Sequence, residues 1–185
     1  MMTSEPTDIP GCTVVALVQH ADDRGEFVKV YQASVARAAG KNFTVAELIW
    51  SRSRRGAVRG LHFQIPPHAH SKLVTIISGT ALDVVVDLRV GSPTFGQHRA
   101  ITFDAAEPSA VFIPEGCAHG FQAGSDDVTI AYATSTEHAP DADRGIRWDS
   151  IGLKWPIAEA VTSKRDAELP ALAEFDSPFV YAVTP

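Results

Sequence analysis

The feature that most constrains the fold is a series of short β-rich runs separated by clusters of aspartate, glycine, proline and serine. Such runs, rich in valine, isoleucine, threonine and aromatic residues and bounded by turn residues, are typical of strands. They are CTVVALVQ (12–19), GEFVKVYQ (25–32), FTVAELIWS (43–51), two within KLVTIISGTALDVVVDLRV (72–90), HRAITF (98–103), SAVFIP (109–114), HGFQA (119–123) and DVTIAYATS (127–135). Many short strands at regular spacing predict an all-β barrel or double-sheet jelly roll.

Turns and helices are marked less clearly. The Ser78-Gly79 pair predicts a β-hairpin within the longest β-rich run. Ser34–Gly40 predicts a short helix closed by its glycine, and 163–175 predicts a second helix interrupted by Pro170. We therefore expect short peripheral helices, mainly in the C-terminal part of the chain.

The chain shows no internal repeat or low-complexity tract. Its 185 residues suit one domain, 1–185. We expect the jelly-roll barrel over 10–135 and, over 136–185, a C-terminal loop and helical segment that closes the active site. Within the latter, the polar stretch 137–145 is predicted to be a loop.

Composition narrows the class of protein. Hydrophobic residues make up 45% of the chain, which is enough for a core, and the net charge of -6 argues against a general nucleic-acid binder. Two distant cysteines, Cys12 and Cys117, give no disulfide framework and favour a reducing, cytoplasmic location. The N-terminus lacks a signal-peptide pattern, and no apolar run approaches the roughly 20 residues that span a bilayer.

Alternation along the strands brings chemically useful side chains to common faces. One face carries Gly60, His62 and Gln64, a second Lys72, Val74 and Ile76, and a third Ile130, Tyr132 and Thr134. His119 follows the turn IPEGCA. A base, a cation, a phenol and a second histidine in one cavity suit proton abstraction next to a carbonyl. The base takes the proton from carbon, the cation stabilises the enolate oxygen, and an acid returns a proton on the opposite face.

Each of these residues also has an ordinary structural interpretation. His62 can be a hydrogen-bonded core histidine, Tyr132 a packed aromatic and Lys72 a solvated residue at a strand end. Asp166 fits a helix capping box with Ser163. Spacing alone does not choose a reaction.

A metal site is a further alternative. His68, His70 and the histidine of PEGCAH, His119, resemble the two halves of a cupin metal site. However, the residues just after His70 offer no carboxylate, so we expect no metal and no cofactor.

Asp83 and Asp87 also have an ordinary structural interpretation, as polar residues near turns on an exposed sheet face.

Eight blocks of sequence carry a resemblance to a known family. They are DDRGEF, VRGLHFQ, KLV, DVVVDLRVGSPTFGQ, FIPEGCAHGF, RGIRWD, KWP and SKRDAELP, in family order from Asp22 to Pro170. With them the chain resembles the dTDP-4-dehydrorhamnose 3,5-epimerase family of jelly-roll cupins. The resemblance implies a metal-free isomerase that epimerises a nucleotide-diphosphate-linked 4-keto-6-deoxy sugar, and a homodimer that shares a strand near its N-terminus.

The resemblance also implies roles for individual residues. The base is His62 with Asp166 as its partner, the acid is Tyr132, and Lys72 faces the C4 oxygen. His119 supports that oxyanion, held by Asp83. The implied substrate-binding positions are Arg24, Phe27, Lys29, Glu47, Ile49, Arg59 and Glu137. Strict alternation places Arg59 opposite His62, and a bend at Gly60 would reconcile them.

The nucleotide end departs from the family pattern while the catalytic positions match. The departures are Lys29 for a glutamate, Glu47 and Ile49 for glutamine and asparagine, Glu137-His138 for a tyrosine pair, and His98 for a tryptophan. A base other than thymine therefore stays open, as does the choice between C3, C5 or both carbons. The alternatives to a nucleotide-sugar epimerase are a metal-dependent cupin enzyme and a non-catalytic sugar-binding module.

Overall fold

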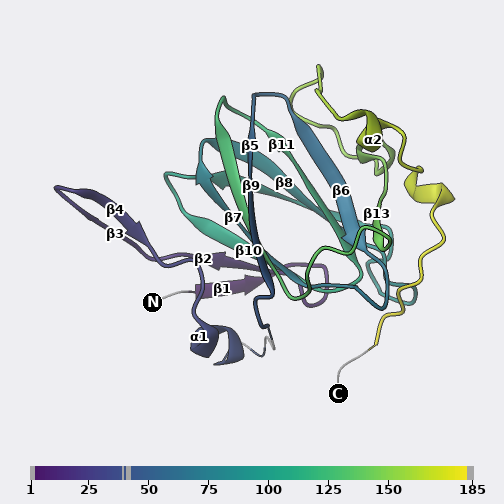
Figure 1. Ribbon diagram of the computed structural model, residues 1–185, viewed down its shortest axis with the longest axis horizontal. Helices are drawn as coiled ribbons and strands as arrows, with labels where there is room; N and C mark the ends of the chain where they lie inside the picture. Colours follow the sequence, from purple (N-terminus) through teal and green to yellow (C-terminus); the bar gives the residue numbers. More distant parts are fainter. Residues whose placement is uncertain (1–2, 39, 41–42, 183–185) are drawn as a thin grey trace.

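Two antiparallel sheets packed face to face form the body of the protein in a computed structural model that describes residues 3–38, 40 and 43–182 (Figure 1). The strands are β1 (Thr3–Pro6), β2 (Thr13–Ala16), β3 (Gln19–Asp22), β4 (Gly25–Val28), β5 (Glu47–Ser53), β6 (Val58–Gln64), β7 (Lys72–Ser78), β8 (Thr80–Asp87), β9 (His98–Asp104), β10 (Ser109–Ile113), β11 (Cys117–Ala123), β12 (Val128–Thr134) and β13 (Asp143–Gly145). The helices are α1 (Ala33–Ala38) and α2 (Lys164–Ala167), with 3-10 turns η1 (Trp148–Ser150) and η2 (Leu172–Glu174). Within the described ranges, no helix is long and apolar enough to cross a membrane.

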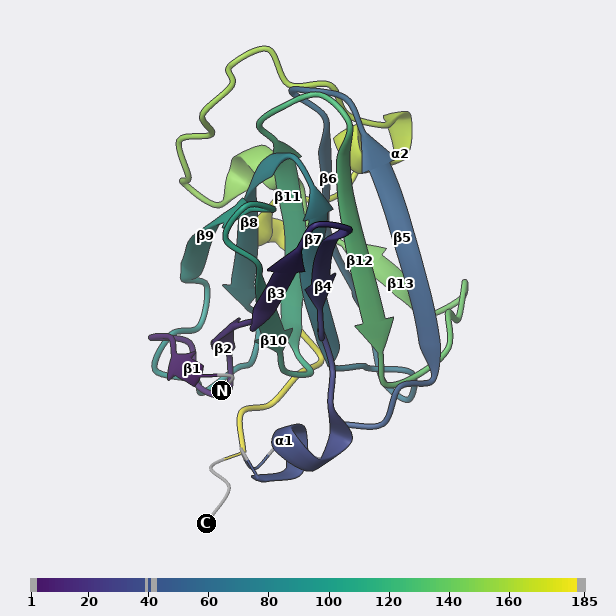
Figure 2. The ribbon, with the colours of Figure 1, turned by 90° about the vertical axis from the view of Figure 1, so that its left-hand side faces the viewer.

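The six-stranded sheet has the order β1-β2-β10-β7-β12-β5, and the five-stranded sheet has the order β13-β6-β11-β8-β9. Strands β3 and β4 form a separate two-stranded arm that projects away from both sheets (Figure 1). Figure 2 shows the sheets from the side of the arm, with β5 at the edge next to β12. The all-β jelly-roll prediction is confirmed.

Apolar side chains fill two layers. One core lies between the sheets and includes Val74, Phe103 and Ile130. The second core includes Val84 and Trp155 and lies where the C-terminal segment covers the outer face of the five-stranded sheet. The consecutive valines 84–86 of β8 do not alternate with polar residues, because both faces of the strand are buried there.

The hairpin predicted at Ser78-Gly79 is wrong. Strand β7 pairs with β10 and β12, whereas β8 pairs with β11 and β9, so the chain passes from one sheet to the other at this point. Gly79 has a φ of 78°, and a Cβ there would lie 2.5 Å from the Ser125 hydroxyl oxygen. A turn signal marks a reversal of the chain, but pairing is decided by which sheet buries each strand.

Three smaller expectations also need correction. The predicted loop 137–145 ends in a strand, because β13 pairs with β6. The helix predicted over 163–175 is only α2, capped by the Ser163 hydroxyl, with η2 following Pro170. Asp83 and Asp87 are fully buried rather than on an exposed face.

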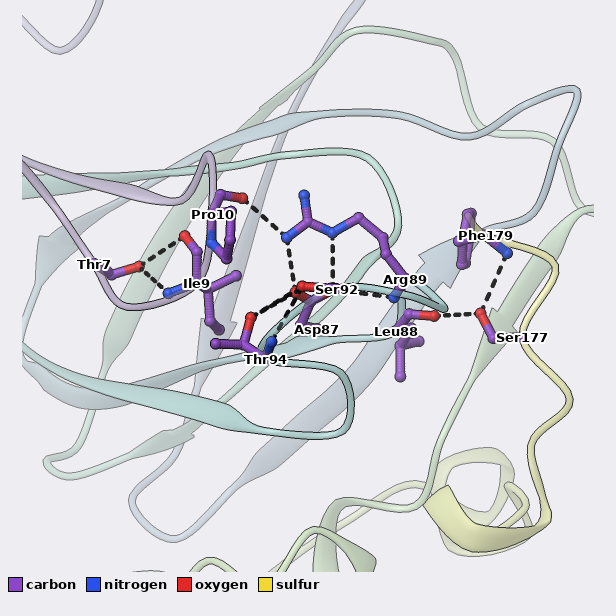
Figure 3. Close-up of polar contacts among 10 residues, drawn as sticks. All are labelled: Thr7, Ile9, Pro10, Asp87, Leu88, Arg89, Ser92, Thr94, Ser177 and Phe179. Carbon is purple, nitrogen blue, oxygen red and sulfur yellow. Dashed lines mark hydrogen bonds and ion pairs between the residues drawn. The ribbon is translucent and has the colours of Figure 1, made fainter. Parts of the chain in front are cut away.

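The burial of Asp87 has a structural explanation. Its carboxylate accepts hydrogen bonds from the backbone N–H and guanidinium of Arg89 and from the hydroxyls of Ser92 and Thr94 (Figure 3). Arg89 also donates to the Pro10 carbonyl, which ties the N-terminal segment to the end of β8. Burial alone would raise the pKa of Asp87, but these donors outweigh it and hold the pKa below its usual range.

Candidate active site

A cavity of about 480 Å³ opens between the two sheets, and a smaller one of about 190 Å³ adjoins it. Four residues line both hollows: His62, Lys72, Tyr132 and Arg165. Because His62 lies on β6 and Tyr132 on β12, the base and acid expected from the sequence come from opposite sheets.

A β-bulge in β6 brings Arg59 and His62 to the same cavity. His119 of β11 pairs with His62, while Phe121 pairs with Arg59, so one extra residue of β6 lies between the two pairs. Gly60 is within this irregularity, has a φ of 126°, and approaches Gly120 so closely that a Cβ would lie 2.6 Å from its Cα. The bend expected at Gly60 is thus present.

His62 and Asp166 form a short hydrogen-bonded pair, with His62 Nε2 2.7 Å from Asp166 Oδ1. The second carboxylate oxygen accepts the Gly60 backbone N–H at 3.2 Å. Burial raises the pKa of Asp166, but His62, Gly60 and Arg165 outweigh it and hold the pKa below its usual value. The capping bond from Asp166 N to the Ser163 hydroxyl is also present, at 3.0 Å, so the cap and the histidine contact coexist.

An ionised carboxylate only accepts hydrogen bonds. The His62 nitrogen that faces Asp166 therefore carries the hydrogen, and Nδ1 keeps its lone pair. The side chain of His62 is 29% exposed, whereas that of Asp166 is 6% exposed. The carboxylate is thus sealed behind an imidazole that faces the cavity.

Lys72 is buried between the sheets and donates to the His62 carbonyl at 3.1 Å. Burial lowers the pKa of its ammonium to about 8, opposed by the charges of Asp143 and Asp83. His119 Nε2 lies 2.6 Å from Asp83 Oδ2, and both residues are buried. The solvated interpretation of Lys72 is therefore wrong.

The Tyr132 ring makes an edge-to-face contact with the His119 ring, with centroids 5.9 Å apart and an angle of 69° between the ring planes. Its oxygen lies 3.1 Å from the hydroxyl oxygen of Ser51 on β5. Burial raises the pKa of Tyr132 well above its usual value, so the phenol is protonated at neutral pH. Sequence reasoning missed Ser51, because its partner is 81 residues away.

Four of the remaining expected substrate-binding positions lie on or near the two sheets, and the other three lie on or beside the arm. Arg59 lines the larger cavity and donates to the Ser53 hydroxyl at 2.9 Å, and Ile49 lines the smaller one. Glu47 accepts the backbone N–H of His138 at 2.8 Å at the same end, whereas Glu137 is exposed and is not among the lining residues.

Arg24, Phe27 and Lys29 do not join the site within one chain. Arg24 and Phe27 lie on the arm and Lys29 directly follows it, with Arg24 paired to Asp22 at 2.6 Å. All three are exposed and none lines either cavity, and the arm projects away from both sheets (Figure 1).

Besides Ser51, which contacts Tyr132 from outside the cavity lining, sequence reasoning missed two residues of the cavity. Arg165 pairs with Asp143 at 2.7 Å, and both line the smaller cavity. Arg165 adjoins Asp166 in the chain, which is a local signal, but nothing local distinguishes Asp143. His70, which the sequence suggested only as a metal ligand, also lines this cavity and accepts from the Gln64 amide at Nδ1, and burial lowers its pKa to about 3.

The metal alternative rests on His68, His70 and His119. In the part of the chain that the structure describes, no three histidine, cysteine, aspartate or glutamate side chains form a group able to hold a metal ion. His119 is instead engaged by Asp83, and His70 by Gln64.

A carboxylate–imidazole pair, a buried ammonium and a protonated phenol facing one cavity of a jelly roll define an acid–base enzyme of the cupin type. A family profile described as dTDP-4-dehydrorhamnose 3,5-epimerase matches residues 6–174. The chain belongs to this family of sugar-nucleotide isomerases.

Named relatives agree with this assignment. The dTDP-4-dehydrorhamnose 3,5-epimerase of Mycolicibacterium smegmatis is 39% identical over 94% of this chain and 87% of the relative. The dTDP-4-dehydrorhamnose 3-epimerase of Streptomyces niveus is 38% identical over 94% and 85%. The crystal structure of dTDP-6-deoxy-D-glucose-3,5-epimerase from Legionella pneumophila, in complex with dTDP-4-keto-L-rhamnose, has a TM-score of 0.93 and 31% identity, covering 98% and 100% of the two chains.

Proposed function

We propose that the protein epimerises a nucleotide-diphosphate-linked 4-keto-6-deoxy sugar at carbons next to the C4 ketone. The observation that carries the proposal is the placement of the His62–Asp166 pair and Tyr132 on opposite sheets across one cavity, which Lys72 of β7 also lines. A proton can then leave one face of the sugar and return to the other, which is what inversion requires. A sugar-binding module without catalysis has no need of this arrangement.

In the first step, His62 Nδ1 takes the proton from the carbon next to the ketone. The electron pair of the broken C–H bond moves into an enolate, and its negative charge develops on the C4 oxygen. The imidazolium that forms is stabilised by the ionised Asp166 at 2.7 Å.

The enolate oxygen needs a donor that is in place before the reaction. We assign this role to Lys72, which the Asp143 and Asp83 charges help to keep protonated despite its burial. His119 supports the same region, and its Nε2 contact with Asp83 fixes its ring orientation. In the last step, Tyr132 gives its phenolic proton to carbon on the face opposite His62.

The test is incubation in D2O with nucleotide-linked 4-keto-6-deoxy sugars, with the position of deuterium read by NMR. We expect deuterium at C3 and C5 with inverted configuration. Deuterium at C3 alone identifies a single-carbon epimerase, the second candidate, which the similarity to the Streptomyces niveus 3-epimerase favours. No exchange at either carbon with any such sugar would contradict the proposal.

We also propose that the protein is a homodimer in which the arm of one copy completes the site of the other. Arg24, Phe27 and Lys29 are exposed and do not line their own cavity, and Phe27 is 61% exposed. The edge strand β5 exposes Leu48 and Trp50, and a symmetric partner would cover such an edge. A monomer in light scattering at micromolar concentration would contradict this.

In such a dimer, Arg59 and the partner's arginine 24 would hold the diphosphate, since planar guanidinium groups suit phosphate oxygens. The segment 136–185 would close the cavity, because it contributes Arg165 and Asp166 to the lining. The cytoplasmic location expected from the cysteine content stays a prediction.

A further inference from the structure

The inward face of β5 carries two serines for which the sequence suggested no role. Ser51 Oγ lies 3.1 Å from the Tyr132 oxygen, and Ser53 Oγ accepts the Arg59 Nε–H at 2.9 Å. Residues two apart on a strand share a face, so one edge strand contacts the phenol and the arginine that line the same cavity.

We propose that Ser51 is a positioning residue for the acid step, donating its hydroxyl hydrogen to the Tyr132 oxygen so that the phenolic hydrogen faces the cavity. The proposal rests on the proposed function and extends it to a residue outside the cavity lining. Ser51 itself need not touch the substrate.

The register of the strands explains why Ser51 can do this. On β5, Ser51 is directly opposite Ile130, and Ile49 is directly opposite Tyr132, so the Ser51–Tyr132 contact is diagonal across the pair. Long side chains reach such diagonal neighbours. The edge-to-face contact with His119 restrains the phenol ring, but it does not set the direction of the hydroxyl hydrogen.

A phenol has one hydrogen to give. If Tyr132 donates it to Ser51, that hydrogen points away from the sugar. If Ser51 donates instead, the phenolic hydrogen is available to the carbon that must be protonated. Between these two orientations at 3.1 Å, only the second allows Tyr132 to act as the acid.

Ser51 also stabilises what the acid step leaves behind. As the O–H bond of Tyr132 breaks, the enolate electron pair forms the new C–H bond, and the negative charge passes to the phenolate. Burial opposes that charge and raises the pKa of Tyr132, whereas the Ser51 contact acts in the opposite direction. The Ser51 O–H bond stays intact and supplies a donor to the phenolate oxygen.

The experiment separates proton removal from inversion. In D2O, His62 can remove a proton and return deuterium to the same face, which gives exchange without inversion. For Ser51→Ala we expect inversion to fall about 10–150-fold, the range for a lost hydrogen bond to a charged group. Exchange should stay within about threefold of the unaltered protein, because His62 and Asp166 are untouched. Ser51→Thr keeps the hydroxyl and should restore inversion.

Ser53→Ala is the matched control, because it removes the neighbouring hydroxyl that holds Arg59 rather than Tyr132. We expect it to raise KM and to leave the ratio of inversion to exchange unchanged. In a Tyr132→Phe background, Ser51→Ala should have no further effect on inversion, since its partner hydroxyl is already gone.

Three results would overturn the inference alone: Ser51→Ala with an unchanged ratio of inversion to exchange, a loss that Ser51→Thr does not restore, or an additive loss in the Tyr132→Phe background. Absence of both exchange and inversion in the unaltered protein would instead overturn the proposed function, and this inference with it.

Discussion

Replacing Asp166 by asparagine tests the proposed base most directly, because the substitution keeps the shape of the side chain and removes its charge. The carboxylate has two fixed neighbours: Oδ1 faces His62 Nε2 at 2.7 Å, and Oδ2 accepts the Gly60 N–H at 3.2 Å. In Asp166→Asn the amide oxygen is needed by Gly60, so the amide NH2 group turns toward His62. An imidazole that accepts there must carry its hydrogen on Nδ1, the nitrogen that should take the proton.

The expected loss has two parts. Loss of a charge-assisted hydrogen bond to the imidazolium costs about 1.5–3 kcal/mol, or about 10–150-fold. The reversed tautomer removes the base itself, which is worth about 10²–10⁴-fold. Because the two effects act on one group, we expect a combined decrease in kcat of about 10³–10⁴-fold rather than their product.

The assay is the rate of deuterium incorporation into the 4-keto sugar, with thermal unfolding measured alongside to confirm that the variant folds. The matched control is Glu168→Gln, which removes an exposed carboxylate that lies 3.8 Å from the Lys164 ammonium just beyond α2. Exposed pairs contribute little, so the control should keep its activity. A folded Asp166→Asn that exchanges deuterium within tenfold of the unaltered protein would refute the assignment of the base.

Five further outcomes are expected. His62→Ala should abolish deuterium exchange, and Tyr132→Phe should lower kcat by about 10²–10⁴-fold with little change in KM, because general acid–base groups act in the transition state; near-normal exchange in His62→Ala would make it a core residue only. Activity should fall as the pH rises through about 8, because the protonated Lys72 is the functional form and burial has lowered its pKa to that value; a profile flat to pH 10 would remove Lys72 from the enolate step. Asp87→Ala should destabilise the fold by about 3–5 kcal/mol in denaturant titration, because it leaves a buried guanidinium without its carboxylate, and a cost below 1 kcal/mol would contradict the account of that network. Calorimetric titration should show that at least one of UDP, CDP and GDP binds as tightly as dTDP, since a carboxylate at Glu47 accepts hydrogen bonds but does not donate them. A clear preference for dTDP over the other three would refute this.

Much of this protein could be predicted from local patterns. The β-rich runs indicated a jelly roll, since strands with short turns between them must bury their apolar faces against a second sheet. Alternation also placed His62, Lys72 and Tyr132 toward one interior, because side chains two apart on a strand share a face. The cap at Ser163 could likewise be predicted, since Ser163 and the Asp166 N–H that its hydroxyl accepts are only three positions apart.

Tertiary structure decided what depended on partners distant in the chain. Sequence alone predicted a hairpin at Ser78-Gly79, but β7 and β8 belong to different sheets, because strand pairing depends on which sheet buries each strand. Sequence alone predicted Asp83 on an exposed face. In the structure Asp83 is buried, and the hydrogen bond with His119, 36 residues away, offsets the cost of burying its carboxylate. The sequence did not identify Ser51, because a serine on a strand has the same local pattern whether it faces solvent or a phenol.

The β-bulge at Gly60 shows most clearly what the sequence determines and what only the tertiary structure decides. The sequence contains the glycine and the two side chains that must face the cavity, and strict alternation places Arg59 and His62 on opposite faces. The structure resolves the conflict by inserting one residue of β6 against β11, where Gly120 leaves room for the close approach. A period of two follows from backbone geometry and can be read from one strand, whereas a register shift depends on the neighbouring strand and exists only in the assembled sheet.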